Sequence, residues 1–481
     1  MTRSLRGEGD TTMTTLAGDL ASYLAAFDLR DAPAEVVEKA RACIRDTVGV
    51  ALAGARSPWA RSAIAAALSE GPDGGPAHVV GTARSTSASL AALANGTSGH
   101  SLDFDDDNAQ VHAGAAVVAV GLAVGEVVNA SGQEFVRSVI VGYETAVRVA
   151  WAMDPDALYA RGFHPTGVCN AFGSAMTAGV LLGLDEKRLV DAIGIVGSMA
   201  GGLLEFYTDG AMTKRLHGGH PASCGVMAAK LASHGFTGPA TVFEGPFGAL
   251  RAYAGEATRP DEITRGLGTD FKILATAQKY YPMNFATHGA IDAVRRIMER
   301  EGLAPEQIAR VAVHVRPFVA EAIGGSSKHR PATILAAQMS MPFAVALAAT
   351  EGRITLDHLS ERWVRDETIL QIAAKVTTFA CPELDHVAGI EDGSVLPTRL
   401  TIETDAGQEF SDEIIYQRGD PNNPLSDQDL GEKFLDCASR TLGSERALEV
   451  SSDLDRVVGW NDITNFMHSL EVRADEHTTV G

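Results

Sequence analysis

Acidic residues and histidines gather in one stretch of the sequence, between Asn95 and Gly125. Four aspartates stand between positions 103 and 107, His112 follows, and a run of small apolar residues occupies 113–125. This run is too rich in Ala and Gly for a surface helix and predicts a fully buried one. A carboxylate desolvated beside such a helix needs a partner, so the stretch is either a solvated acidic loop or part of a site.

Other polar residues lie against Gly/Ala-rich segments further along the chain. They are His164, His288 and a basic group, Lys214 and Arg215 beside His217. A neutral imidazole can act as general base or acid near pH 7, and Lys or Arg can bind a carboxylate. Each histidine taken singly is more often structural, with its ring hydrogen-bonded to the backbone. Together, the residues indicate proton transfer next to a bound carboxylate.

Several other chemistries have no sequence support. The chain contains no P-loop, no GxGxxG motif that opens a helix after a strand, no GxSxG and no HExxH. The aspartates after Phe104 could instead ligate a hard cation, but EF-hand spacing is absent. No metal site is therefore expected.

Composition narrows the class of protein. The 481 residues carry a net charge of −21, which argues against nucleic-acid and anionic-membrane partners. An anionic substrate would need a local basic site to overcome this field. The five cysteines have no paired or metal-type spacing, there is no signal-peptide pattern, and no apolar run reaches the ~18 residues of a membrane span. We expect a cytoplasmic protein.

Helical patterns fill the chain to about residue 274, with a short strand-like piece at 77–82 and a buried helix expected only after His220. The pattern then changes: residues 308–317 alternate as a strand, 333–354 read as one apolar helix, and 396–415 read as a β-hairpin. Helical patterns return after Pro424. The predicted fold is mainly α, an all-helical domain (1–274 and 416–481) with a smaller α+β domain inserted at 275–415.

Five motifs in order resemble the MmgE/PrpD family of 2-methylcitrate dehydratases, cis-aconitate decarboxylases and iminodisuccinate epimerases. They occupy residues 94–106 together with His112, and residues 162–175, 213–245, 279–293 and 336–348. The resemblance implies an all-α domain with an inserted α+β lid, a homodimer, and an active site between the domains. It also implies that no metal or organic cofactor is needed.

The resemblance also implies a set of site residues. The catalytic positions would be Asp103, His112, His164, Lys214 and His288, and the substrate-binding positions Asp107, Arg215, His217 and Lys279. The expected activity is that of a hydro-lyase, similar to 2-methylcitrate dehydratase, which removes a proton next to a carboxylate of a small hydroxy di- or tricarboxylate. The alternatives are an epimerase or isomerase of a dicarboxylate, a decarboxylase similar to cis-aconitate decarboxylase, and a non-catalytic carboxylate binder.

Three positions depart from the family pattern. Asp107 stands where Thr is common, Ala113 where Pro is common, and Phe343 where Tyr is frequent. An ionised Asp107 in the pocket would repel a third substrate carboxylate, favouring a dicarboxylate or a substrate with an amino or imino group. The alternative is that Asp107 faces solvent or pairs with Arg215 or another cation.

Overall fold

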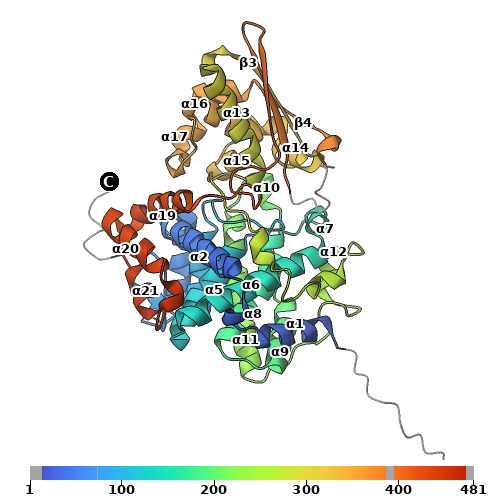
Figure 1. Ribbon diagram of the computed structural model, residues 1–481, viewed down its shortest axis with the longest axis vertical. Coiled ribbons are helices and arrows are strands. Elements are labelled where there is room, and N and C mark those ends of the chain that lie inside the picture. The colour runs from blue at the N-terminus through green and yellow to red at the C-terminus, as the bar shows by residue number, and fades with distance from the viewer. Residues whose placement is uncertain (1–13, 73, 386–394, 473–481) are drawn as a thin grey trace, which may run out of the picture.

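The computed structural model describes residues 14–72, 74–385 and 395–472, which form a helical body and a smaller region built around a β-sheet (Figure 1). The predicted mainly α fold is confirmed. Among the described residues, no helix is both long and apolar enough to cross a membrane.

The helical body is formed by the first part of the chain together with its last part. Its helices are α1 (Leu16–Ala26), α2 (Ala34–Gly54), α3 (Pro58–Glu70), α4 (Ala88–Gly99), α5 (Ala113–Val128), α6 (Gly132–Met153), α7 (Pro155–Ala160), α8 (Pro165–Leu181), α9 (Glu186–Gly197), α10 (Phe206–Asp209), α11 (Thr213–Ser233), α12 (Ala249–Ala254), α19 (Asp427–Leu442), α20 (Ser444–Leu454) and α21 (Thr464–Ser469). In Figure 1 the red helix α19 lies beside the blue helix α2, and the two pack together.

Glycines let α4 and α11 approach closely. A Cβ on Gly218 of α11 would lie 2.4 Å from the carbonyl oxygen of Gly96 in α4 and 2.7 Å from Cβ of His100. A Cβ on Gly219 would lie 2.1 Å from the carbonyl oxygen of Leu93. Because only glycine fits at such an approach, this spacing brings the end of α4 against the first turns of α11.

The second region is a four-stranded sheet in the order β4-β3-β5-β6, with β3 and β4 parallel and the other pairs antiparallel. The strands are β3 (Ile308–Val315), β4 (Val376–Ala380), β5 (Thr398–Thr404) and β6 (Glu409–Ile414). Its helices are α13 (His288–Glu301), α14 (Pro317–Ile323), α15 (Ile334–Gln338), α16 (Met341–Glu351), α17 (Glu361–Val364) and α18 (Glu367–Ala373). The predicted hairpin is confirmed, with Gly407 at φ +75° in its turn.

Two main hydrophobic clusters correspond to these regions. One combines residues 17–273 with residues 434–470, and the other is formed mainly by residues 280–430. The division into 1–274, 275–415 and 416–481 stays a prediction. Leu425 and Leu430 nevertheless pack with the second cluster although they lie beyond 415, and so does Phe206.

Three sequence predictions of elements were wrong. Helix α11 begins at Thr213, well before His220, and continues through Pro221, where a proline usually marks a boundary. The single helix predicted at 333–354 is two helices, because Ser340 caps α16 by accepting the Phe343 N–H. Helix α20 was not predicted. The strand-like piece at 77–82 is shorter than expected: β1 (Ala77–His78) pairs with β2 (Ser85–Thr86).

Candidate active site

The acidic turn between α4 and α5 is buried. Asp103, Asp105 and Asp106 are at most 1% exposed, so the solvated-loop interpretation is wrong for them. Asp106 fixes the start of α5, because its carboxylate accepts the Gly114 N–H and the Tyr143 hydroxyl. Burial, opposed by the Tyr143 bond, raises the pKa of Asp106 to about 7. This carboxyl group has a structural role at the helix N-terminus.

Asp103 joins two lysines from different parts of the chain. Its Oδ1 lies 2.7 Å from Nζ of Lys214 and 3.1 Å from Nζ of Lys279, and all three side chains are nearly inaccessible. Burial alone would raise the pKa of Asp103, but the two ammonium groups outweigh it and hold that pKa well below its usual value. Burial also lowers the pKa of Lys214. A buried ion group of this kind is weak evidence for stability, which points to a functional reason for keeping it.

Lys433 of α19 anchors the same acidic turn through three contacts, which together are called the Lys433 brace. Its Nζ lies 2.6 Å from Oδ1 of the buried Asp46 and donates to the carbonyl oxygens of Phe104 (2.7 Å) and Lys279 (2.8 Å). The brace therefore connects the acidic turn to the segment that carries Lys279. Sequence reasoning missed Lys433, because one lysine in an ordinary amphipathic helix gives no signal.

Four histidine rings form a cluster next to the lysines. The ring centroids lie 4.8 Å apart for His100–His112, 6.4 Å for His112–His164 and 5.0 Å for His164–His217. Nδ1 of His164 lies 2.9 Å from Nδ1 of His217, so one of the two nitrogens donates and the other accepts. The structure thus brings together three predicted histidines and adds His100.

Backbone and carboxylate contacts orient these rings. Nδ1 of His112 lies 2.6 Å from the carbonyl oxygen of Asp106, which can only accept, so Nδ1 carries the proton and Nε2 is the basic nitrogen of the neutral ring. Nδ1 of His100 lies 2.7 Å from Oδ2 of Asp105. Burial lowers the pKa of His112 and of His164 well below the usual value, and that of His217 to about 3. These rings are therefore neutral bases near pH 7.

Asp107 lies at the edge of the cluster, with its side chain 22% exposed. Its Oδ2 is 3.8 Å from Nε2 of His112, and its backbone forms a two-way bridge with Ala277. Burial, opposed by Lys279 and reinforced by Asp105, raises the pKa of Asp107 to about 6. The carboxylate thus faces the basic nitrogen of His112.

Arg215 contacts a residue from the second region. It donates to Oε1 of Gln338 (2.6 Å) and lies over the ring of Trp59, so Gln338 takes the place suggested for Asp107 as its partner. The amide of Gln338 also donates to the carbonyl oxygens of Leu102 (2.6 Å) and Pro282 (2.9 Å). Gln338 lies inside the family motif at residues 336–348, but nothing in its residue type indicated this role.

His288 is placed apart from the other rings. It packs edge-on against Tyr281 and Phe285, both 5.0–5.1 Å away between centroids, rather than against the histidine cluster. Among the described residues neither ring nitrogen makes a hydrogen bond of standard geometry, although the Met283 backbone is close enough to favour protonation slightly. Burial, with Lys279 nearby, lowers the pKa of His288 to about 3.

The site combines cations and carboxylates. Three buried cations, Lys214, Lys279 and Arg215, lie in one group with two carboxylates whose pKa values are lowered, Asp103 and Asp105. Burial would raise the pKa of Asp105, but His100, His112 and Lys279 outweigh burial and hold that pKa below its usual value. Asp107, with a pKa of about 6, is a third carboxylate near neutral pH. The three cations are therefore the groups that can bind an anionic substrate, and the carboxylates offset much of their charge.

Several buried polar atoms of this group have no hydrogen-bond partner within the described part of the chain. They are Nε2 of His100, Oδ2 of Asp103, Oδ1 of Asp105 and Nη1 of Arg215. Buried polar atoms are nearly always hydrogen-bonded, so a group of unpaired donors and acceptors marks a place for a polar ligand. The rings of Tyr159 and Phe206 pack edge-to-face with the ring of His164.

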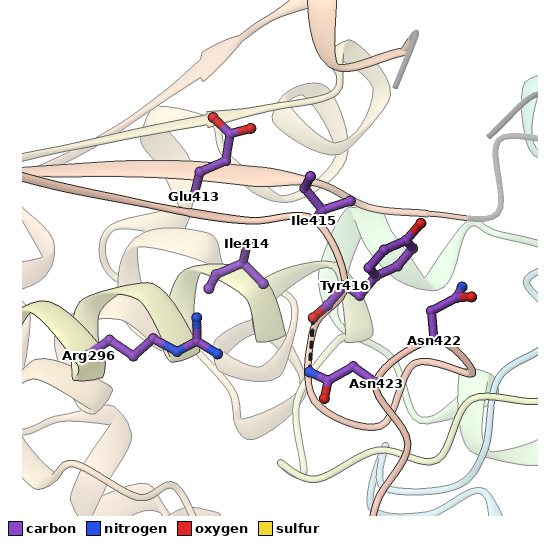
Figure 2. A pocket seen from close by; sticks show the side chains of 7 residues that line it. All are labelled: Arg296, Glu413, Ile414, Ile415, Tyr416, Asn422 and Asn423. Atoms are coloured by element: carbon purple, nitrogen blue, oxygen red, sulfur yellow. Dashed lines mark hydrogen bonds between the residues drawn. The ribbon is translucent and has the colours of Figure 1, made fainter. Parts of the chain in front are cut away.

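Two other features bear on where a ligand could bind. His100, Asp105 and His112 offer atoms within 4.8 Å of one another, close enough to hold a metal ion, although Nδ1 of His100 already bonds Asp105. A separate hollow has a volume of about 370 Å³ and is lined by residues such as Arg296, Glu413 and Tyr416 (Figure 2). The predicted site residues are not among the described residues that line it.

The chain is similar to several known proteins over most of its length. The chain is 28% identical to the cis-aconitate decarboxylase of Aspergillus terreus, with 94% of each chain aligned. It is 26% identical to a cis-aconitate decarboxylase-like protein of Aspergillus oryzae, over 94% of this chain and 97% of that one. It is also 28% identical to human cis-aconitate decarboxylase, over 73% of each.

Family models match both parts of the molecule. The MmgE/PrpD N-terminal domain matches residues 18–260, and the MmgE/PrpD C-terminal domain matches residues 281–456. The family and these relatives indicate an enzyme of the lyase or decarboxylase type. With both domain models matched in order along most of its length, the chain belongs to the MmgE/PrpD family.

Proposed function

We propose that this protein is a cofactor-independent lyase that decarboxylates a small unsaturated di- or tricarboxylate. The observation that carries the proposal is a buried cationic group, Lys214 and Lys279 bonded to Asp103, near the neutral rings of His112 and His164, whose pKa values its charge helps to lower. Cations bind and orient carboxylates, and imidazoles move protons. The relatives named as cis-aconitate decarboxylases favour decarboxylation over the hydro-lyase reaction predicted from the sequence.

Decarboxylation needs a cationic group that stabilises the negative charge left on the substrate and a protonated group that delivers a proton to carbon. The C–C bond to a carboxylate breaks, CO2 leaves, and the bonding electron pair shifts through the double bond to a carbon that takes up a proton. Lys214, Arg215 and Lys279 would stabilise the enolate-like charge on the remaining carboxylate. An anionic substrate beside His112 raises the pKa of that ring, so the bound state can protonate His112 and use it as the acid.

Dehydration of a hydroxy acid is the second candidate. The observation that favours it is the separation of two proton-transfer groups, Nε2 of His112 on one side and the His164–His217 pair on the other, with 6.4 Å between the His112 and His164 rings. One group would remove the proton next to a carboxylate, while the other protonates the departing hydroxyl. The same arrangement also suits the predicted epimerase.

A panel of polycarboxylates tests these reactions against one another. Release of CO2 with substrate loss supports the decarboxylase, and a new conjugated double bond without CO2 supports the hydro-lyase. Exchange of the α-hydrogen in D2O without net turnover supports the epimerase. Saturable binding with none of these would leave a carboxylate binder and refute the lyase. His112→Asn should abolish turnover, whereas His234→Ala, at an exposed position after α11, is the matched control.

We also propose that the protein is a cytoplasmic homodimer. Apolar side chains are exposed on and after α11, including Leu216 (40%), Met227 (42%) and Phe236 (59%), and a second copy could cover them. The five cysteines are free thiols, as expected in a reducing compartment. Light scattering coupled to size-exclusion chromatography measures the mass directly, and a monomer at micromolar concentration contradicts the dimer.

A further inference from the structure

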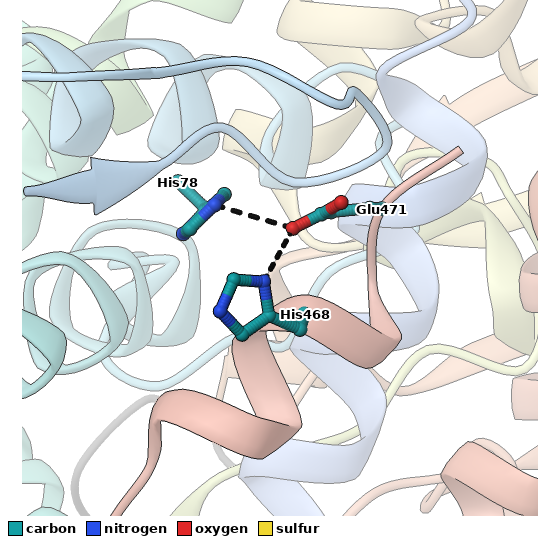
Figure 3. Close-up of side chains that lie close together, drawn as sticks. All are labelled: His78, His468 and Glu471. Carbon is teal, nitrogen blue, oxygen red and sulfur yellow. Dashed lines mark hydrogen bonds and ion pairs between the residues drawn. The ribbon is translucent and has the colours of Figure 1, made fainter. Parts of the chain in front are cut away.

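A second cluster of metal-type side chains combines His78 with two residues near the end of the described chain, His468 and Glu471. Figure 3 shows His78, His468 and Glu471 converging, with both rings directed at the Glu471 carboxylate. Oε1 of Glu471 lies 2.6 Å from Nδ1 of His468 and 3.2 Å from Nε2 of His78. One ligand atom from each of the three residues lies within 4.8 Å of the other two. Two imidazole nitrogens and one carboxylate oxygen thus share a single small volume.

A buried carboxylate holds one of these rings in position. Glu126 of α5, with a side chain only 5% exposed, bonds Nδ1 of His78 and accepts the His78 backbone N–H at 2.8 Å. Because a carboxylate only accepts hydrogen bonds, the contact with Glu126 places a proton on Nδ1 of His78, and Nε2 is then the ring nitrogen that a cation between His78 and Glu471 would bind. Histidines that bind metals in proteins almost always make such a second contact through their other nitrogen.

The backbone around the cluster is also fixed. The Gly81 N–H donates to the carbonyl oxygen of Leu470 (3.1 Å), which ties the loop after β1 to the end of α21. Arg446 of α20 donates to the carbonyl oxygens of Ser469 (3.0 Å) and Glu471 (2.5 Å). The three side chains are therefore presented by anchored segments.

We propose that His78, His468 and Glu471 bind a borderline divalent transition-metal ion, with Zn²⁺ as the best match, at a site separate from the active site. Zn²⁺ takes His nitrogen and carboxylate oxygen at about 2.0–2.2 Å in a tetrahedron, so its ligand atoms lie roughly 3.3 Å apart. The Glu471 oxygen is already 3.2 Å from Nε2 of His78, whereas Nδ1 of His468, at 2.6 Å, must move slightly away from it to admit the ion. Two histidines and one glutamate leave a fourth position for water, and exposure of His468 (54%) gives solvent access to it. The ion would join β1 to the C-terminal helix.

The proposal departs from the expectation, drawn from the sequence, that the chain holds no metal site. His78 and His468 are separated by 390 residues, so no spacing rule could connect them. The function of the ion would be to clamp the end of the described chain onto the body, since a ligand that binds only the folded state stabilises it.

Isothermal titration calorimetry of the EDTA-treated protein with Zn²⁺ tests the site. Co²⁺ in place of Zn²⁺ gives a visible absorption spectrum that reports tetrahedral nitrogen and oxygen ligands. We expect one ion bound at micromolar concentration and a higher Tm. His468→Ala and Glu471→Gln should each weaken binding at least 100-fold, and Glu126→Gln about 10–100-fold through the loss of its support to His78. The exposed control His234→Ala should bind Zn²⁺ as the wild type does.

Two outcomes overturn the proposal. Absence of Zn²⁺ binding at micromolar concentration shows that the cluster is a hydrogen-bonded network only. Binding that persists in His468→Ala but is lost in His112→Asn places the ion at His100, Asp105 and His112 instead. Substrate turnover provides a separate readout, because His468→Ala should retain wild-type kcat/KM whether or not the lyase assignment is correct.

Discussion

Asp107→Asn should stabilise the protein above pH 6. Burial raises the pKa of Asp107 to about 6 from an ordinary value of 3.8. A raised carboxyl pKa means that the folded state binds the proton more tightly, so wild-type stability falls as pH rises from about 4 to 6 and stays lower above that. Two pKa units at 1.36 kcal/mol each give a penalty of about 3 kcal/mol. The variant lacks the ionised carboxylate and therefore lacks this penalty.

Urea unfolding of both proteins at pH 4.5 and pH 8 measures the effect. The stability of Asp107→Asn relative to wild type should increase by about 2–3 kcal/mol between the two pH values. Asp405→Asn, in the exposed turn between β5 and β6, is the control and should show no such change. Equal pH dependence in Asp107→Asn and wild type would refute the idea that Asp107 is held in a desolvated, anionic setting.

The same variant tests substrate selection. At 4 Å and an effective dielectric constant of 20, two like charges repel by about 4 kcal/mol, so an ionised Asp107 should discriminate strongly against a third carboxylate that binds beside it. Asp107→Asn and Asp107→Thr should both raise kcat/KM for tricarboxylates relative to dicarboxylates. An unchanged ranking of substrates in both variants shows that Asp107 does not face the substrate.

Three further changes probe the site. Lys214→Ala should lower kcat/KM by about 10–100-fold, since a charge-assisted bond to carboxylate contributes about 1.5–3 kcal/mol, and an unchanged kcat/KM in a folded variant removes Lys214 from the site. Turnover should survive EDTA; complete loss that one divalent ion reverses would assign a catalytic metal to His100, Asp105 and His112. Gly218→Ala should destabilise the fold and reduce turnover, because its Cβ meets Gly96 and His100 at 2.4–2.7 Å; wild-type Tm and kcat/KM contradict the packing argument.

The sequence predicted the helices well where apolar periodicity was unbroken, as in α5, and the hairpin where Asp-Ala-Gly marked a turn. It failed where tertiary contacts overrode a local rule. Pro221 lies inside α11, just after the glycines that pack closely on α4, and this packing cannot be read from one segment alone. From the sequence alone, the acidic turn could equally have been exposed to solvent, because the lysines that neutralise it come from distant segments of the chain.

The candidate site was predicted in part for the same reason. Residues with a motif of their own, such as Asp103, His112 and Lys214, were found. Residues that contribute a single contact from a distant segment were not predicted. Examples are Gln338, which bonds Arg215, and Lys433, which bonds the acidic turn. His100 lies in the family motif at residues 94–106, and its place at the end of a buried helix could have identified it as a site residue. The role of His288 stays a prediction.

The Lys433 brace has a consequence for how the chain acquires its site during synthesis. The bond from Lys433 to Phe104 spans 329 residues, so the acidic turn leaves the ribosome long before its brace exists. At roughly 5–20 residues per second, that interval lasts on the order of 15–65 s. Until then, Asp46 lacks the cation that accompanies it in the finished fold. A nascent chain that stops short of α19 would therefore carry the catalytic motifs without a completed site, and would expose them to chaperones and proteases rather than to substrate.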